Sequence, residues 1–119
     1  MKPELQKRLV KFSAGIIWLA KDLKQCFAVK HLYSQIVRSA TSAALNYGEA
    51  QTAETRKDFI HKLGIVLKEL KETEVNLEII LESIIYRQET PVINSLAECR
   101  ELIAIFTATI KTVRKKSEG

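Results

Sequence analysis

The sequence predicts an all-α protein that folds as an antiparallel, up-down-up-down four-helix bundle. Its 119 residues include only four Gly and two Pro, which is too few breakers for many short strands. Apolar residues recur every three or four positions along most of the chain, as on one face of a helix. Short polar breaks separate these segments and favour antiparallel neighbours. We expect one domain over residues 1–119, with helices at about 3–26, 31–50, 54–88 and 92–116.

The first two expected helices differ in the size of their apolar side chains. Pro3 suits the first turn of the first helix, where its missing N–H costs nothing. That helix carries large apolar residues at helical spacing, namely Leu5, Leu9, Phe12, Ile16, Leu19 and Leu23. Residues 27–30 read as a connection. The second helix carries small residues instead, including Ala40, Ala43 and Ala44, which allow a neighbouring helix to approach closely.

The last two expected helices have recognisable start signals. Thr55 with Asp58 resembles a capping box, in which each side chain bonds a backbone donor at the helix start. Thr73 is the one polar residue in the apolar register of the third helix. The fourth helix can start at Thr90 before Pro91, or at Ser95 with Glu98 three residues later.

The apolar stripes on the first, third and fourth helices are wider than one bundle needs. A core-facing helix requires a stripe of about 100°. Surplus apolar surface on a helical protein usually ends in a subunit interface. We therefore expect a homo-oligomer.

Composition limits the class of protein. Hydrophobic residues make up 46% and charged residues 28%, which is typical of a globular domain. The longest apolar run, residues 14–20, is far shorter than the roughly 20 residues of a membrane span. The charged start lacks the pattern of a signal peptide. Cys26 and Cys99 form no Cys-x-x-Cys motif. We expect a cytoplasmic protein with no membrane partner, metal or cofactor.

Patterns typical of an enzyme are missing from the sequence. A di-iron bundle needs Glu-x-x-His motifs, and neither His31 nor His61 has Glu three residues before it. Glycine-rich phosphate loops and the nucleophile-elbow motif are also absent. We therefore expect no catalytic residues and a protein that acts by binding.

Basic residues gather at one end of the expected bundle. In an up-down topology the chain start, the turn between the second and third helices and the end of the fourth helix meet there. This end collects eleven cations, namely Lys2, Lys7, Arg8, Lys11, Arg56, Lys57, Lys62, Lys111, Arg114, Lys115 and Lys116. Five carboxylates oppose them, namely Glu4, Glu49, Glu54, Asp58 and Glu118. Eleven cations and five carboxylates give this end a net charge of +6. Because the net charge of the whole chain is +5, the rest of the chain carries −1.

Two interpretations of this end remain open. Cations near a helix C-terminus oppose the macrodipole, which explains Lys115 and Lys116 without any ligand. Alternatively, several subunits that present this end around one axis would attract a phosphate backbone through counterion release. The candidate nucleic-acid contacts are Lys7, Arg8, Lys11, Arg56, Lys57, Lys111, Arg114, Lys115 and Lys116.

A second candidate site is a polar face on the second helix. Its members follow spacings of four, four and three residues, namely Arg38, Ser42, Asn46 and Glu49. Glu69 and Glu72 on the third helix are the expected partners. One interpretation is a binding groove or a polar contact between subunits. The other, which we favour, is a half-buried network in which Arg38 pairs with a carboxylate and fixes the register of the helices.

These same residues carry a resemblance to a known family. The segment Gln35–Glu49 contains the pattern Arg-Ser-Ala-x-Ser-x-x-x-Asn-x-x-Glu, and residues 68–73 read Lys-Glu-Leu-Lys-Glu-Thr. Both patterns resemble the four-helix-bundle family of 23S ribosomal RNA intervening-sequence proteins. Two positions depart from the family's usual pattern, Gly48 before the glutamate and Ala50 after it. The resemblance implies a bacterial protein that assembles into a ring-shaped homopentamer.

A protein of related fold, the accessory protein of diversity-generating retroelements, adds an expectation by analogy. It is a pentameric bundle that binds nucleic acid and a reverse transcriptase through a basic surface. The sequence therefore supports a non-enzymatic bundle that binds RNA or DNA, structured RNA above all, through a basic end. The alternative is a protein–protein adaptor or accessory subunit, for example for a reverse transcriptase.

Overall fold

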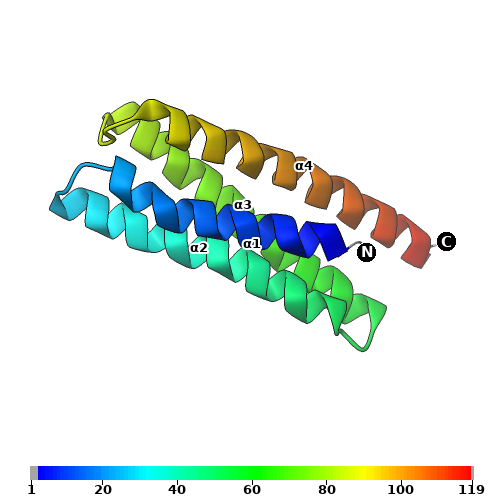
Figure 1. Ribbon diagram of the computed structural model, residues 1–119. Helices are drawn as coiled ribbons and strands as arrows, with labels where there is room; N and C mark the ends of the chain where they lie inside the picture. The colour runs from blue at the N-terminus through cyan, green and yellow to red at the C-terminus, as the bar shows by residue number, and fades with distance from the viewer. Residues whose placement is uncertain (1–2, 119) are drawn as a thin grey trace.

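The computed structural model describes residues 3–118, with the side chains of residues 4–116, and holds four α-helices and no strand over that range. The helices are α1 (Pro3–Trp18), α2 (Phe27–Gln51), α3 (Arg56–Ser83) and α4 (Glu89–Glu118), and a short 3₁₀ helix, η1 (Leu19–Asp22), follows α1. Consecutive helices run in opposite directions along a molecule of 50 × 22 × 20 Å (Figure 1). The expected all-α, four-helix architecture is confirmed.

The core lies along the inner faces of all four helices. Leu9, Phe12 and Ile16 of α1 are buried at the 3–4 spacing that the sequence shows. Tyr47 of α2 meets Phe106 of α4 edge to face, with ring centroids 5.4 Å apart. Helix α2 packs against both α1 and α3, and α4 packs mainly against α3. The fully buried alanines of α2 allow these close approaches.

The first helix ends earlier than the sequence predicts, and the second begins earlier. Leu23 has an extended backbone (φ −100°, ψ 144°) and forms an isolated antiparallel bridge with Tyr86. The amide of Lys24 donates to the carbonyl of Ile85 at 2.8 Å. Because these residues pair with the α3–α4 connection, they cannot continue a helix to Cys26. Residues 27–30, expected as a connection, are the first turn of α2, where Val29 is buried.

The third and fourth helices also differ from the expected bounds. Helix α3 ends at Ser83 instead of residue 88, because Ile84 adopts a left-handed backbone (φ 52°, ψ 42°) that stops an α-helix. The residues after it pair with the α1–α2 connection, and the amide of Arg87 donates to the carbonyl of Asp22. Helix α4 therefore begins at Glu89, before both expected start positions.

The start of α3 follows from its cap. The Thr55 hydroxyl accepts a hydrogen bond from the Asp58 amide at 3.1 Å, so the helix begins at Arg56. This is the Thr55 half of the expected capping box. It places Arg56 and Lys57 in the first turn of α3, next to the α2–α3 turn.

Helix α1 begins beside residues 44–51 of α2 and stops short of the last turns of α4. Gln6 donates to the carbonyl of Ala44 at 3.1 Å, and Ser13 donates to that of Ala40 at 3.0 Å. Helix α2 continues seven residues beyond Ala44 to Gln51, which is about 10 Å at 1.5 Å per residue. The end formed by the α2–α3 turn and the last turns of α4, here called the terminal end, is therefore built mainly from three helices (Figure 1).

The other end of the molecule, here called the opposite end, holds the α1–α2 and α3–α4 connections (Figure 1). Their backbones are joined by the Leu23–Tyr86 bridge. Along the residues that the structure describes, no helix combines the length and apolarity that a membrane span requires.

Candidate nucleic-acid interface and polar network

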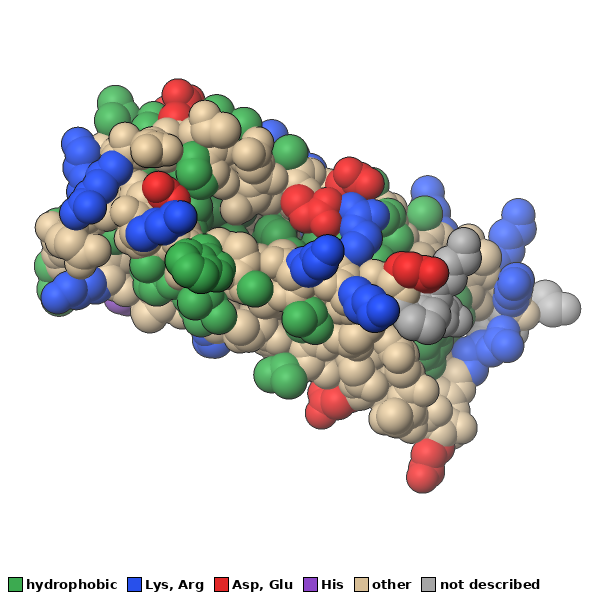
Figure 2. Space-filling model, viewed as in Figure 1, with side chains coloured by type: hydrophobic (Ala, Val, Ile, Leu, Met, Phe, Trp, Pro, Cys, Tyr) green, Lys and Arg blue, Asp and Glu red, His purple; other side chains and the backbone are tan. Residues whose placement is uncertain are grey.

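Six of the nine expected nucleic-acid contacts lie together at the terminal end. They form the terminal cation cluster, which consists of Arg56 and Lys57 of α3 and Lys111, Arg114, Lys115 and Lys116 of α4. All six are exposed, and none forms an ion pair with a side chain among residues 4–116. Figure 2 shows blue side chains projecting from this end, at the right of the view. Their charge faces solvent.

The positions of these cations relative to the helix termini differ. Lys115 and Lys116 lie in the last turn of α4, where cations stabilise the helix. Arg56 and Lys57 lie in the first turn of α3, where the macrodipole disfavours positive charge. Helix stability therefore accounts for the lysines of α4 but leaves the cations of α3 without a structural reason.

A hollow of about 610 Å³ opens at the terminal end, between the α2–α3 turn, the start of α3 and the end of α4. Arg56 and Lys116 line this hollow from α3 and α4, together with the half-buried side chains of Phe59 and Val113. Gln51 and Glu54 line it from the α2–α3 turn. The site therefore combines cations from two helices with a small apolar surface.

The three candidate contacts on α1 do not belong to this end. Lys7, Arg8 and Lys11 lie on α1 between Gln6, which contacts Ala44 and Gln51, and Ser13, which contacts Ala40, and so lie short of the last turns of α4. Arg8 is bound to Glu98 of α4 through Nη2 at 2.6 Å and Nε at 3.1 Å, and Glu101 lies 3.1 Å from Nη2. Arg8 is therefore a paired cation, unlike the six of the terminal cation cluster, and its role as a nucleic-acid contact stays a prediction. Lys7 and Lys11 remain exposed.

The sequence could not reveal the pairing of Arg8, because Glu98 lies 90 residues away and was counted with the rest of the chain. A second cation of the expected end is also engaged, since Lys62 lies 3.2 Å from Glu49. Lys2 and the side chain of Glu118 fall outside the described residues. The terminal cation cluster is therefore the part of the expected basic end in which exposed cations from two helices lie together without ion-pair partners among the described side chains.

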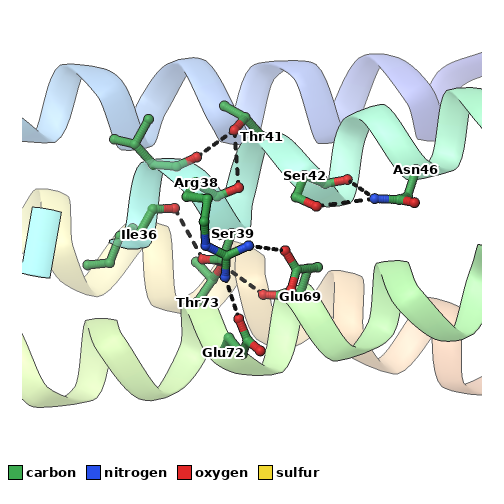
Figure 3. A network of polar contacts seen from close by, with 10 residues as sticks. Ile36, Arg38, Ser39, Thr41, Ser42, Asn46, Glu69, Glu72 and Thr73 are labelled. Carbon is green, nitrogen blue, oxygen red and sulfur yellow. Dashed lines mark hydrogen bonds and ion pairs between the residues drawn. The ribbon is translucent and has the colours of Figure 1, made fainter. Parts of the chain in front are cut away.

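The polar network predicted between the second and third helices is centred on Arg38. Figure 3 shows its guanidinium reaching from α2 to two glutamates of α3. Nη1 lies 2.8 Å from Glu69, and Nη2 lies 2.6 Å from Glu72. Arg38 therefore joins two adjacent carboxylates, one turn apart on α3, to the middle of α2.

Glu69 is the buried member of this network, with 6% of its surface exposed. Burial opposes ionisation of its carboxyl group, but hydrogen bonds from Arg38 and Ser42 outweigh burial and hold the pKa of Glu69 below its ordinary value. The carboxylate is therefore charged at neutral pH and depends on Arg38 for its stability in that form.

A second buried pair lies beside it. The hydroxyls of Ser39 and Thr73 are 2.6 Å apart (Figure 3). Each hydroxyl also lies within hydrogen-bond distance of a backbone carbonyl of its own helix, Ser39 of Ile36 and Thr73 of Glu69, so either one can donate to the other. The sequence signal for this pair was Thr73, the polar residue in an apolar register, but its partner could not be chosen from the sequence.

The other members of the predicted polar face have different partners. Asn46 donates to the carbonyl and hydroxyl of Ser42 within α2 (Figure 3). Glu49 pairs with Lys62, nearer the terminal end. The face is therefore divided: Arg38 bonds Glu69 and Glu72 of α3, whereas Asn46 bonds Ser42 within α2 and Glu49 bonds Lys62.

The two cysteines have different surroundings. Cys99 is buried and donates to the carbonyl of Leu70 at 3.2 Å. Burial, reinforced by the negative charge of Glu74, raises the pKa of the Cys99 thiol to about 12. Cys26 is exposed at the N-cap of α2.

Comparison with known proteins gives a consistent relationship. The sequence profile of the family described as 23S rRNA-intervening sequence protein matches residues 2–108. A solved structure from Bacteroides thetaiotaomicron, a protein of unknown function from the S23 ribosomal protein family, is 31% identical. It superposes with a TM-score of 0.76 and covers 90% of this chain and 98% of that chain. A comparison with curated proteins finds no match. The chain belongs to the family of 23S rRNA-intervening sequence proteins.

Proposed function

We propose that this chain is a non-enzymatic, homo-oligomeric bundle of the cytoplasm that binds structured RNA electrostatically through the terminal cation cluster. The observation that carries the proposal is the presence of six exposed cations at one end, without ion-pair partners among the described side chains. Phosphate is the natural ligand for such a surface. The family name concerns ribosomal RNA and agrees with this choice.

The proposed binding follows the backbone and not the base sequence. Lysine and arginine contacts to phosphates release condensed counterions, so affinity falls with salt by a log–log slope of about −0.9 per contacted phosphate on a duplex. If all six cations of the cluster contact phosphates, the slope for one subunit reaches about −5. The cluster offers no exposed aromatic ring for reading single-stranded bases.

The oligomeric part of the proposal is supported by apolar side chains on α1 and α2. Val10, Ile17 and Leu45 expose more than half of their surface. Figure 2 shows hydrophobic side chains along this face of the molecule. A second copy of the chain would cover them, and a ring would place several terminal ends side by side. The resemblance to ring-forming bundles suggests a homopentamer.

Light scattering on the purified protein tests the assembly. We expect a mass well above 13.5 kDa, the mass of one chain, at micromolar concentration. A monomer at that concentration would refute the homo-oligomer, and each terminal end would then act alone.

A salt-titrated binding assay with a labelled RNA hairpin tests the RNA contact. The test variant is Lys115→Gln with Lys116→Gln, and the matched control is Lys68→Gln with Lys71→Gln, which removes the same charge from an exposed part of α3. We expect the test variant to bind about tenfold more weakly at low salt with a slope smaller by about 2, and the control to change little. Equal losses in both variants, or no binding at low salt, would contradict the proposal.

A protein–protein adaptor is the second candidate function, because a groove of about 740 Å³ runs between α2 and α3. Leu67 and Val75 line it together with Lys68 and Lys71, and Val75 is 54% exposed. Such a groove suits an accessory subunit, for example one of a reverse transcriptase. Co-purification of one defined protein after nuclease treatment, lost on Val75→Glu, would favour this function.

A further inference from the structure

A second hollow lies at the opposite end, between the end of α1 and the start of α4. It has a volume of about 310 Å³, and its lining residues are Gly15, Trp18, Leu19, Lys21, Asp22, Gln88, Pro91 and Ser95. Trp18 is the only tryptophan of the chain. We call this feature the Trp18 hollow. It shares no residue with the terminal cation cluster, and the length of the bundle separates the two.

Trp18 offers an aromatic face beside this hollow. It exposes 67% of its surface, although Trp is usually well buried in folded proteins. The Lys21 ammonium lies 5.2 Å from the centroid of the indole ring, a distance that fits a cation–π contact. An exposed indole beside a cation is the arrangement on which nucleobases stack in proteins that bind single strands.

The space beside the indole is small in volume and is not filled by neighbouring side chains. A Cβ atom built on Gly15, three residues before Trp18, would meet nothing within 4 Å. Leu19 and Pro91 contribute apolar surface. A volume near 310 Å³ is at the lower limit for small-ligand sites, about 300 Å³. The hollow therefore suits one planar ring system and is too small for a helix or a duplex.

Asp22 supplies the polar recognition. Only 9% of its surface is exposed, and the residue lines the hollow. An ionised carboxylate only accepts hydrogen bonds, so a ligand bound at Asp22 has to supply the donors. The backbone of Asp22 is held by the amide of Arg87 and by the Leu23–Tyr86 bridge. These backbone contacts fix the position of Asp22, and its carboxylate can accept hydrogen bonds from a ligand in the hollow.

One cation, Lys21, lines the hollow, and two more, Lys24 and Arg87, belong to the connections at the same end. Lys21, Lys24 and Arg87 are exposed and have no ion-pair partner among the side chains that the structure describes. Figure 2 shows blue side chains at the left end of the view as well as at the right. These cations favour a ligand that carries a phosphate over one that is itself a cation.

We propose that the Trp18 hollow binds one guanine nucleotide of a single-stranded nucleic acid. The base stacks on the Trp18 indole in place of the Lys21 ammonium, which moves to the phosphate. Guanine is preferred because its N1–H and exocyclic amino group are adjacent donors that a single carboxylate accepts together, whereas uracil offers one donor. Gln88 and Ser95 are positioned to bond other edges of the base.

Intrinsic fluorescence tests this proposal directly, because the single tryptophan lies at the site. Guanosine monophosphate is titrated into the full chain, with uridine monophosphate and inorganic phosphate as parallel probes. We expect the guanine nucleotide to quench the fluorescence saturably, with a dissociation constant at least fivefold lower than that of the uracil nucleotide. Phosphate should cause no quenching. Since stacking and carboxylate contacts carry the affinity, the guanine preference persists between about 50 mM and about 200 mM salt.

Two variants identify the residues. Asp22→Asn keeps the size of the side chain but adds an amide donor, and we expect it to weaken guanine binding at least fivefold while leaving uracil binding unchanged. Trp18→Ala removes an exposed ring, so the chain still folds, and calorimetry should show loss of both nucleotides. Circular dichroism confirms the fold of each variant.

Three results would overturn the proposal. They are the absence of quenching at millimolar nucleotide, equal affinity for both bases in the parent and Asp22→Asn proteins, and tighter binding of a cation such as methylguanidinium than of the guanine nucleotide. The Lys115→Gln, Lys116→Gln variant should bind the guanine nucleotide as the parent does, and Trp18→Ala should keep the salt-dependent contact with the RNA hairpin. Failure of either site is therefore distinguishable from failure of the other.

Discussion

The middle of the bundle and its terminal end use the same basic residue types in opposite ways. In the middle, Arg8, Arg38 and Arg100 each contact two carboxylates. These contacts join α1 to α4, α2 to α3, and α3 to α4. At the terminal end, the six cations of the terminal cation cluster have no carboxylate partner among the described side chains. In the middle of the bundle the basic side chains join neighbouring helices through ion pairs. At the terminal end they are exposed to solvent and can bind an external anion.

The difference shows that the role of a cation depends on the burial of its partner more than on its own type. Glu69 is almost fully buried, so Arg38 is indispensable to it. The two partners of Arg100 are more exposed, since Glu74 exposes 26% and Glu78 48% of the side chain, so water can solvate both carboxylates if Arg100 is removed. Ion pairs between exposed side chains contribute only about 0–1 kcal/mol. Variants of both kinds of cation can break or sharpen this contrast.

The largest effect is expected for Arg38→Met. The change leaves the buried Glu69 carboxylate without its main partner and should lower the free energy of unfolding by about 2 kcal/mol. The value is below the range for fully buried pairs because 59% of the Arg38 side chain is exposed. Urea denaturation followed by circular dichroism measures it. Arg100→Met is the matched control, with an expected loss below about 1 kcal/mol.

If both variants lose the same stability, burial of the partner does not decide the role of these arginines. A loss in Arg38→Met near zero would show that Glu69 finds other donors.

The next effect is the acid sensitivity of the same pair. Because the pKa of Glu69 is held below its ordinary value, the ionised carboxylate stabilises the fold. This contribution is complete above the ordinary Glu pKa of about 4.3 and is lost as pH falls through the lower pKa of folded Glu69. We expect stability to fall with pH in that window, and to fall less steeply in Glu69→Gln. Urea midpoints at several pH values measure the slope, and parallel slopes would refute the assignment.

A smaller effect, of opposite sign, is expected for Tyr47→Phe. The Tyr47 hydroxyl is buried and has no hydrogen-bond partner among the described residues, and burial raises the pKa of Tyr47. Removal of the hydroxyl keeps the edge-to-face contact with Phe106 and should stabilise the fold by up to about 1 kcal/mol. Thermal unfolding would show a higher midpoint. A lower midpoint would mean that the hydroxyl has a partner in solution.

The smallest expected effect is a difference in RNA affinity between two variants, one that removes an arginine without an ion-pair partner and one that removes an arginine with such partners. Arg114→Gln should weaken binding to the RNA hairpin about threefold at low salt, because one phosphate contact is lost. Arg8→Gln should leave that affinity unchanged, because Glu98 and Glu101 already engage Arg8. Equal losses in the two variants would place Arg8 in the interface after all.

Local sequence patterns determined much of this protein. The 3–4 spacing of Leu9, Phe12 and Ile16 specifies a buried helix face, because the periodicity belongs to a single helix and needs no partner to be read. The Thr55 cap with the Asp58 amide is equally local, since its two groups are three residues apart. The pairing of Arg38 with Glu69 and Glu72 was also predictable, because adjacent helices of a bundle face each other and the residue types are complementary.

Only the tertiary structure decided the register of the helices and therefore the partners of individual charges. The sequence extended the first helix to residue 26, but the pairing of Leu23 with Tyr86 ends the helical segment at Asp22. The side-chain register of α1 places Arg8 against Glu98 instead of at the terminal end. It also places Trp18 beside the start of α4. These positions depend on packing summed over all four helices and on connections between segments far apart in the chain, which no local pattern encodes.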